Sequence, residues 1–129
     1  MSGVRAIRYL LANNAALTSV VPAANIKAVL PQGVTRPAIE VKHISTTYRH
    51  MIASSEDCRS RVQVTVHATS YPSQHSILSL VREALPRTHG TVDGVEVKSL
   101  IKDVVGPDMR NDDIQSFIGS QDFIIEYKE

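Results

Sequence analysis

The chain has 129 residues, of which 14 are basic and 13 acidic, so its formal net charge is +1. This length predicts one domain, residues 1–129, and the balanced charge excludes a broad field attracting nucleic acid or a membrane surface. No apolar run approaches the ~18 residues of a membrane span, and one cysteine excludes an internal disulfide. We therefore expect a protein with no membrane partner that is synthesised in a cytosol.

The first predicted helix covers residues 2–13. Apolar residues recur there at helical spacing, at Val4, Ile7, Leu10 and Leu11. The helix should end at Asn13 and Asn14, whose side chains compete for backbone hydrogen bonds. A connector broken by Pro22 follows, and then a short strand at residues 26–30.

Two alternating runs, residues 38–48 and 59–69, predict a long antiparallel hairpin. Placing Ile39 opposite Val66 and Val41 opposite Val64 brings the apolar members onto one face, whereas a slip of one residue would not. The other face then carries polar side chains: Glu40, Lys42, Arg59, Arg61, Gln63, Thr65 and His67. We expect this second face to contact water or a polar partner.

The second predicted helix begins near Pro72 and ends before Pro86, which cannot continue it. Ser70 or Ser73 supplies the nearest capping oxygen. Its apolar stripe is wide enough to pack on a sheet and consists of Ile77, Leu80, Val81, Ala84 and Leu85.

The C-terminal third begins with a tight turn at Asp93 and Gly94, followed by a strand containing Val95, Val97 and Ile101. Residues 104–113 are predicted to form a polar loop. The last strand, residues 116–127, is apolar on both faces at Phe123, Ile124 and Ile125, which is typical of a strand that is central or covered by a partner. The predicted fold class is α+β: an antiparallel sheet of about four to five strands with two helices packed on one face.

The sequence predicts no catalytic, cofactor or metal site. Its histidines never occur at metal-ligand spacing, no glycine-rich phosphate loop is present, and no residue is placed as a base for Cys58. Lys42, Arg59 and Arg61 could contact phosphate, but basic residues on an exposed strand face more often serve solubility. We therefore expect a structural or interaction protein and no enzyme.

Four segments together resemble the tail completion proteins of tailed phages, a family similar in role and fold to tail terminators. They are IRYLLANNAALTSVV, IKAVLPQGVTRPAIEVKHIS, RVQVTVHATSYPSQHSILSLVREAL and IQSFIGSQDFIIEY, which span nearly the whole chain in order. The resemblance implies a structural virion protein of the tail neck, assembled in the host cytoplasm. Such a protein forms a hexameric ring, caps the tail tube and joins the tail to the head-side connector. Genome DNA would pass through the lumen without specific binding.

Two other interpretations remain open. One is another ring of the neck, either a stopper or a head-tail adaptor. The other is a small cellular ligand-binding or enzyme-subunit domain, which would require a pocket with convergent polar groups.

Six residues are candidates for protein interfaces. Met51 and Ile52 lie in the hairpin tip, residues 49–57, and Met109 and Arg110 lie in the loop over residues 104–113. We expect these loops to contact neighbouring rings, because loops on a rigid scaffold carry much of protein function. The alternative for the tip is an exposed turn with two incidental apolar residues. Phe123 and Ile125 are candidates for contacts between copies of the chain.

Overall fold

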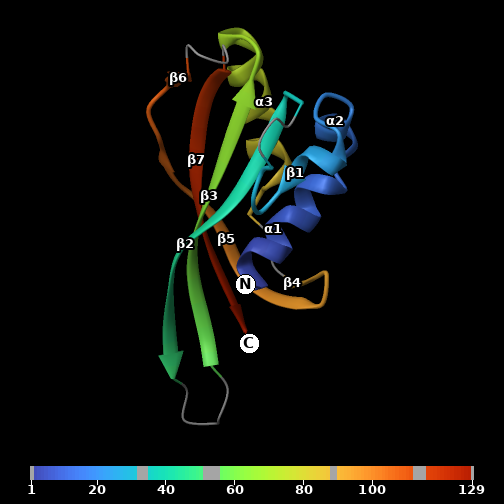
Figure 1. Ribbon diagram of the computed structural model, residues 1–129. Helices are drawn as coiled ribbons and strands as arrows, with labels where there is room; N and C mark the ends of the chain where they lie inside the picture. The colour runs from blue at the N-terminus through green and yellow to red at the C-terminus, as the bar shows by residue number, and fades with distance from the viewer. Residues whose placement is uncertain (1, 32–34, 51–55, 88–89, 112–115, 129) are drawn as a thin grey trace.

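The computed structural model describes residues 2–31, 35–50, 56–87, 90–111 and 116–128, which form one curled sheet covered by helices (Figure 1). The helices are α1 (Ser2–Ala12), α2 (Ala15–Thr18) and α3 (Tyr71–Ala84), with a 3₁₀ turn, η1 (Ala23–Asn25). The strands are β1 (Ile26–Lys27), β2 (Ala38–His50), β3 (Glu56–Ala68), β4 (Gly90–Val92), β5 (Val95–Val105), β6 (Met109–Asn111) and β7 (Ser116–Lys128).

The strands follow the order β1-β2-β3-β7-β5-β4, and β6 pairs with β7 off this path. Every pair is antiparallel except β1 with β2, which is parallel. The predicted α+β class is confirmed, but the described sheet has seven strands, more than the four to five expected. The difference arises from β4 and β6, which are only three residues long and too short for alternation to reveal, whereas β1 lies within the short strand predicted at residues 26–30.

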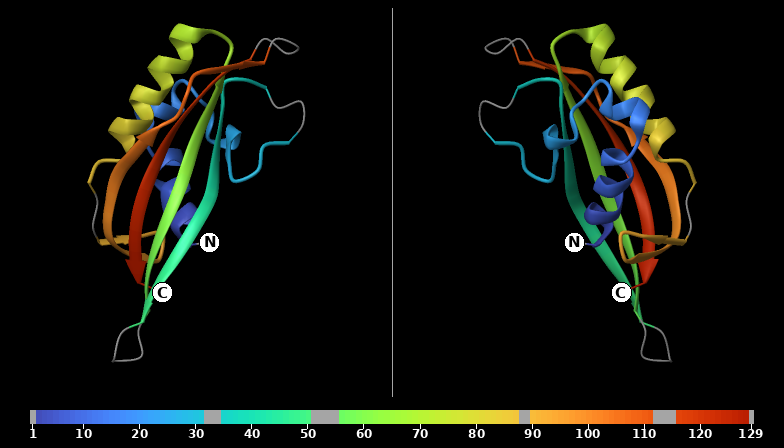
Figure 2. Two further views of the ribbon diagram at one scale, coloured as in Figure 1. Left: turned by 90° about the vertical axis from the view of Figure 1, so that its left-hand side faces the viewer. Right: turned by 90° about the vertical axis from the view of Figure 1, so that its right-hand side faces the viewer.

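Helices α1 and α3 cover the same face of the sheet, as predicted, and Figure 2 shows them in front of it in one view and behind it in the other. Their buried residues, among them Ile7, Leu11, Ile77 and Val81, meet the sheet's apolar face. That face carries Val62, Val64, Val66, Phe123 and Ile125, all fully buried. The opposite face, called here the open face, has no described helix over it.

The β2–β3 hairpin has the predicted register. Ile39 pairs with Val66 and Val41 with Val64, and all four side chains are buried. Beyond His43 the register shifts by one residue before Ser45, which is a β-bulge. The bulge leaves Ile44 exposed and shows where simple alternation stops describing the strand.

Helix α3 begins and ends close to where the sequence predicted. Its N-cap is Ser70, whose side-chain oxygen accepts a hydrogen bond of 3.3 Å from the backbone N–H of Ser73. Pro72 lies in the first turn, and the helix ends at Ala84, before Pro86. No described helix is long and apolar enough to cross a membrane.

The prediction for the C-terminal region is correct in outline and wrong in one segment. Asp93 and Gly94 form the predicted turn with positive φ angles of 47° and 79°, which bulky side chains disfavour. The predicted loop at residues 104–113, however, contains the last two residues of β5 and all of β6, because both pair with β7. A second register shift, between Val97 and Ser99, directs Leu100 into the core and leaves Ile101 partly exposed.

Candidate functional site

The open face of the sheet is the candidate interaction surface. It is built from alternating residues of β2, β3, β7 and β5, which the left view of Figure 2 presents to the reader. Residues on it include Lys42, Arg59, Arg61, Thr65, His67, Asp122, Ile124 and Glu126. The predicted polar face is therefore this surface, and β7 adds the apolar side chain of Ile124 to it.

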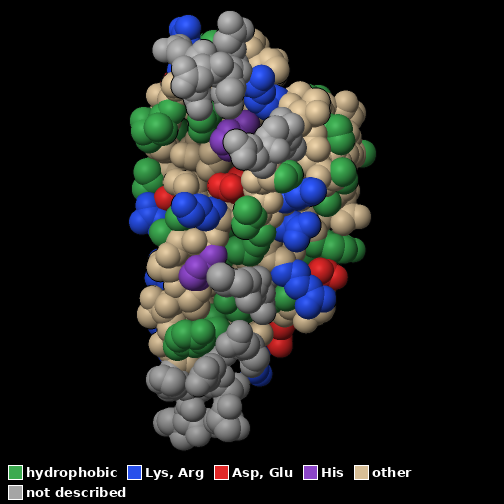
Figure 3. Space-filling view, viewed as in Figure 1, with side chains coloured by type: hydrophobic (Ala, Val, Ile, Leu, Met, Phe, Trp, Pro, Cys, Tyr) green, Lys and Arg blue, Asp and Glu red, His purple; other side chains and the backbone are tan. Residues whose placement is uncertain are grey.

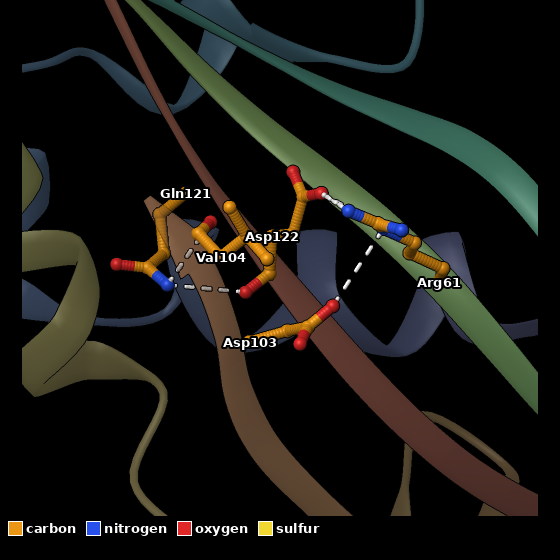
Figure 4. A network of polar contacts seen from close by, with 5 residues as sticks. All are labelled: Arg61, Asp103, Val104, Gln121 and Asp122. Carbon is orange, nitrogen blue, oxygen red and sulfur yellow. Dashed lines mark hydrogen bonds and ion pairs between the residues drawn. The ribbon is translucent and has the colours of Figure 1, made fainter. Parts of the chain in front are cut away.

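An ion-pair network crosses the centre of the open face (Figure 4). Arg61 of β3 directs Nε and Nη2 at one carboxylate oxygen of Asp122 on β7, at 2.8 and 2.6 Å. Asp103 of β5 lies 3.6 Å from the same Nε. The hydrogen bond to Asp122 raises the pKa of Arg61, and only 9% of the Asp122 side chain is exposed. A nearly buried carboxylate of this kind is costly to leave unpaired, so the network holds three strands in one arrangement.

Gln121, the neighbour of Asp122 on β7, points to the opposite side and is buried. Its Nε2 donates to the carbonyl oxygens of Val104 and Asp122, at 3.4 and 3.2 Å (Figure 4). Its Oε1 has no hydrogen-bond partner among the described residues. The side chain therefore joins β7 to β5 where the β5 register shifts between Lys102 and Val105.

Other charges near the sheet are also paired within the chain. Arg59 lies 3.9 Å from Glu126, and Lys98 lies 2.8 Å from Asp57. On the side of the molecule seen in Figure 3, basic, acidic and hydrophobic side chains are likewise interspersed. A partner of the open face would therefore meet a surface that is neutralised locally, which favours recognition by shape over attraction by a broad field.

A second polar cluster fixes the segment before β6. The carboxylate of Asp108 accepts hydrogen bonds from Tyr71 at 3.0 Å and Gln74 at 3.4 Å, and His75 Nε2 lies 3.6 Å away. The hydrogen bond from Tyr71 lowers the pKa of Asp108. These contacts connect the first turns of α3 to the residue just before Met109 and so position β6.

The six predicted interface residues differ in what the structure shows of them. Met51 and Ile52 lie outside the described residues. Met109 is 59% exposed on β6, and the Arg110 guanidinium lies 5.5 Å from the centre of the Phe117 ring. Both remain accessible candidates for contacts with a partner.

The structure corrects the assignment of Phe123 and Ile125 to contacts between copies. Both side chains are fully buried in the chain's own core. The reason is that β7 lies in the middle of the sheet, between β3 and β5, with helices over one face. Of the three apolar residues FII, only Ile124 reaches the open face, where it is partly exposed.

Sequence reasoning also missed several exposed apolar side chains on β2 and β5: Ile44, Val104 and Val105. Each lies next to or within a register shift, where alternation no longer predicts which face a residue occupies. The Arg61 network was missed because its members lie on three strands that are far apart in the sequence. No local pattern predicts such a contact.

The described residues contain no group of three or more His, Cys, Asp or Glu side chains able to hold a metal ion. Cys58 is buried and is not part of a disulfide. Burial lowers the pKa of His67, the histidine on the open face.

A comparison with protein families shows to which family this chain belongs. A model of the family described as "Tail completion protein gp17" matches residues 5–122. The chain belongs to the tail completion protein gp17 family. The resemblance seen in the sequence is thus confirmed, and the family is one of virion structural proteins and not of enzymes.

A solved structure shares the fold of this tail completion protein. It is a chain of the structure titled "Virion of native gene transfer agent (GTA) particle", with a TM-score of 0.80 and 11% sequence identity. The match covers 98% of this chain and 94% of that one. No curated protein sequence matches this tail completion protein.

Proposed function

We propose that this tail completion protein is a tail terminator. Its copies would form a ring, which we expect to be hexameric, and this ring would cap the tail tube and join the tail to the head-side connector. The observation that carries the proposal is the family match over residues 5–122. The shared fold with a chain of a solved virion supports it. The protein would then act in the neck of the particle, after it has been assembled into the particle in the host cytoplasm.

The shape of the subunit supports contacts at two ends. Strand β6 lies at one end of the sheet, and the paired ends of β2 and β3, at His50 and Glu56, lie at the other (Figure 1). A subunit with accessible ends on opposite sides can touch one neighbour above and another below. We assign Met109 and Arg110 to one such contact, and Met51 and Ile52 stay candidates for the other.

The pairing of charges on the open face is consistent with a lumen through which DNA passes. Arg59 and Arg61 on the open face are paired with Glu126 and Asp122, and the net charge of the chain is only +1. Tight binding to DNA requires several free cations that can neutralise phosphates. Passage of the genome without specific binding is consistent with this arrangement.

The test is electron microscopy of particles produced without the protein. We expect overlong or unjoined tails, because tube growth would not be stopped and the head would have no tail surface to bind. Filled heads that leak DNA beside tails of normal length would contradict the proposal and indicate a stopper. Mass measurement of the purified protein with and without tail tubes would give the ring size.

The same system tests the contact at β6 by complementation. Met109→Asp should reduce joined particles at least about tenfold, because a central apolar contact replaced by a charge is strongly disfavoured. Val29→Asp is the matched control, since Val29 is also exposed, at 77%, and lies outside β6. Equal yields from the two variants would remove β6 from the interface.

A further inference from the structure

The outer edge of β5 is only partly covered. β5 lies between β7 and β4, but β4 pairs with residues 95–97 alone. No other described strand pairs with that edge over residues 99–105, and Figure 2 shows β5 (orange) along the side of the sheet. An uncovered edge offers backbone N–H and C=O groups to any extended chain.

A groove of about 660 Å³ runs beside this edge, between β5 and the end of α3. Its floor includes Leu85 and Leu100, which are 2% and 1% exposed. Ile101 of β5 also lines it and is 37% exposed. The groove therefore combines an apolar floor with a strand edge that has hydrogen-bonding capacity.

Three cations line the same groove: Arg82, Arg87 and Lys102. Among the described residues none of them has an ion-pair partner, and Glu83 is the one acidic residue in the lining. Arg61, in contrast, is neutralised by Asp122 on the open face. The groove thus keeps a net positive charge on a protein that pairs many of its other charges internally.

We propose that the β5 edge and this groove bind an extended, acidic segment of another protein, in which apolar and acidic side chains alternate. The segment would add to β5 as a further strand, so that its backbone forms hydrogen bonds with the unpaired N–H and C=O groups of that edge. Because side chains alternate along a strand, one set would enter the groove over Leu85 and Leu100. The acidic side chains would lie near the cations at its rim.

Charge argues against a second copy of this chain as the occupant. The other partly free edge of the sheet is β2, which β1 covers only at Ile39 and Glu40. Beyond that point β2 carries Lys42 and Arg49 and no acidic residue up to His50. Placing this edge in a basic groove would bring like charges together, which costs affinity.

Nucleic acid is disfavoured for a different reason. The phosphates of a nucleic acid would contact the three cations but would leave the apolar floor and the free strand edge without a partner. An acidic peptide segment uses all three features. This site is separate from β6 and the ends of the hairpin, so its test does not depend on whether the protein caps the tail tube.

The experiment uses the full chain and a fluorescent peptide of alternating glutamate and valine, about eight residues long, within the usual range of strands. Fluorescence anisotropy at about 50 mM and about 300 mM NaCl should show binding that weakens with salt. A peptide of alternating lysine and valine should not bind. A glutamate peptide with proline in place of valine should bind at least about tenfold more weakly, because each proline removes a backbone N–H and holds φ away from the value of a regular strand.

The variant Arg82→Gln/Arg87→Gln/Lys102→Gln should lose at least about tenfold in affinity, since all three cations are removed. The control Arg8→Gln/Lys27→Gln/Lys128→Gln removes three exposed cations outside the groove and should change affinity less than about twofold. Amide hydrogen exchange should show new protection over residues 99–102 when the peptide is bound.

Four results would overturn the proposal. They are absence of binding to the wild-type protein, equal binding of the lysine peptide, unchanged affinity of the groove variant, and protection elsewhere than residues 99–102. Binding of single-stranded DNA, lost in the groove variant while the acidic peptide does not bind, would indicate a phosphate site. A change in oligomeric mass caused by the groove variant alone would indicate an interface between copies.

Discussion

Gly119 shows how a single residue determines the packing of α3 on β7. A Cβ atom built at this position would overlap the amide of Gln74 and lie 2.9 Å from Leu78 Cδ1. The Gln74 side chain is fully buried and donates from Nε2 to Asp108. The absence of a side chain at Gly119 therefore makes room for the buried amide and brings the helix close to the strand.

We predict that Gly119→Ala destabilises the protein by about 1–3 kcal/mol, because the added methyl group overpacks a closed contact. Urea unfolding would measure this change. In a Gln74→Ala background the same substitution should cost much less, because the overlapping amide is gone. An equal cost in both backgrounds would show that Gln74 is not the obstacle.

Residue-level prediction from sequence succeeded where the local pattern was regular. Val64 and Val66 face the core as their alternation predicts. For Phe123 and Ile125 the same kind of pattern left two explanations, a central strand or a surface covered by a partner. Burial in the chain's own core selects the first, and only the pairing of β7 with both β3 and β5 provides that information.

At the scale of the element, α3 is the part of the fold most completely specified by local sequence. Its start follows from Ser70 and Pro72, its end from Pro86, and its buried side from an apolar stripe. The sequence left the capping residue open between Ser70 and Ser73. The structure assigns the cap to Ser70, which accepts a hydrogen bond from the backbone of Ser73.

Ser70→Ala should therefore lower the free energy of unfolding by about 1 kcal/mol, the usual cost of losing an N-cap side chain. Ser73→Ala, the matched control, should change it by less than about 0.5 kcal/mol, because its hydroxyl is not the capping group. Denaturant midpoints of the two variants would decide between them. A larger effect at Ser73 would move the cap to that residue.

The strands were less predictable than the helices. β4 and β6 are too short to show a period, and each forms because a longer strand is beside it to pair with. Register shifts in β2 and β5 then move Ile44 and Ile101 toward solvent. These features depend on contacts between distant segments, which a reading of one segment at a time does not contain.

At the scale of the whole molecule, His67 connects stability to pH. Burial lowers the pKa of His67; the Glu40 carboxylate opposes this shift, whereas the Arg36 guanidinium adds to it. The unfolded chain therefore binds a proton at higher pH than the folded protein does. The stabilising contribution of the neutral imidazole is present above the ordinary histidine pKa and is lost as pH falls toward the lowered value.

We predict that the wild-type protein loses more stability between about pH 7.5 and about pH 5.5 than the variant His67→Gln, which cannot titrate there. Denaturant unfolding at the two pH values would measure the difference. Gln63→Ala, a change on the same strand and face, should keep the wild-type pH dependence. Identical pH dependence in wild type and His67→Gln would assign the effect to other groups.

The sequence by itself determined the α+β class, the hairpin register, the limits of α3 and the Asp93–Gly94 turn, and it supported the family resemblance. All of these depend on periodicity, capping or backbone constraints within a short stretch of chain. Only the tertiary structure decided that β7 is central, that Arg61 bridges Asp122 and Asp103, and that a basic groove lies beside a free edge of β5. Those features require strands from distant parts of the chain to be adjacent, and adjacency is a property of the folded sheet.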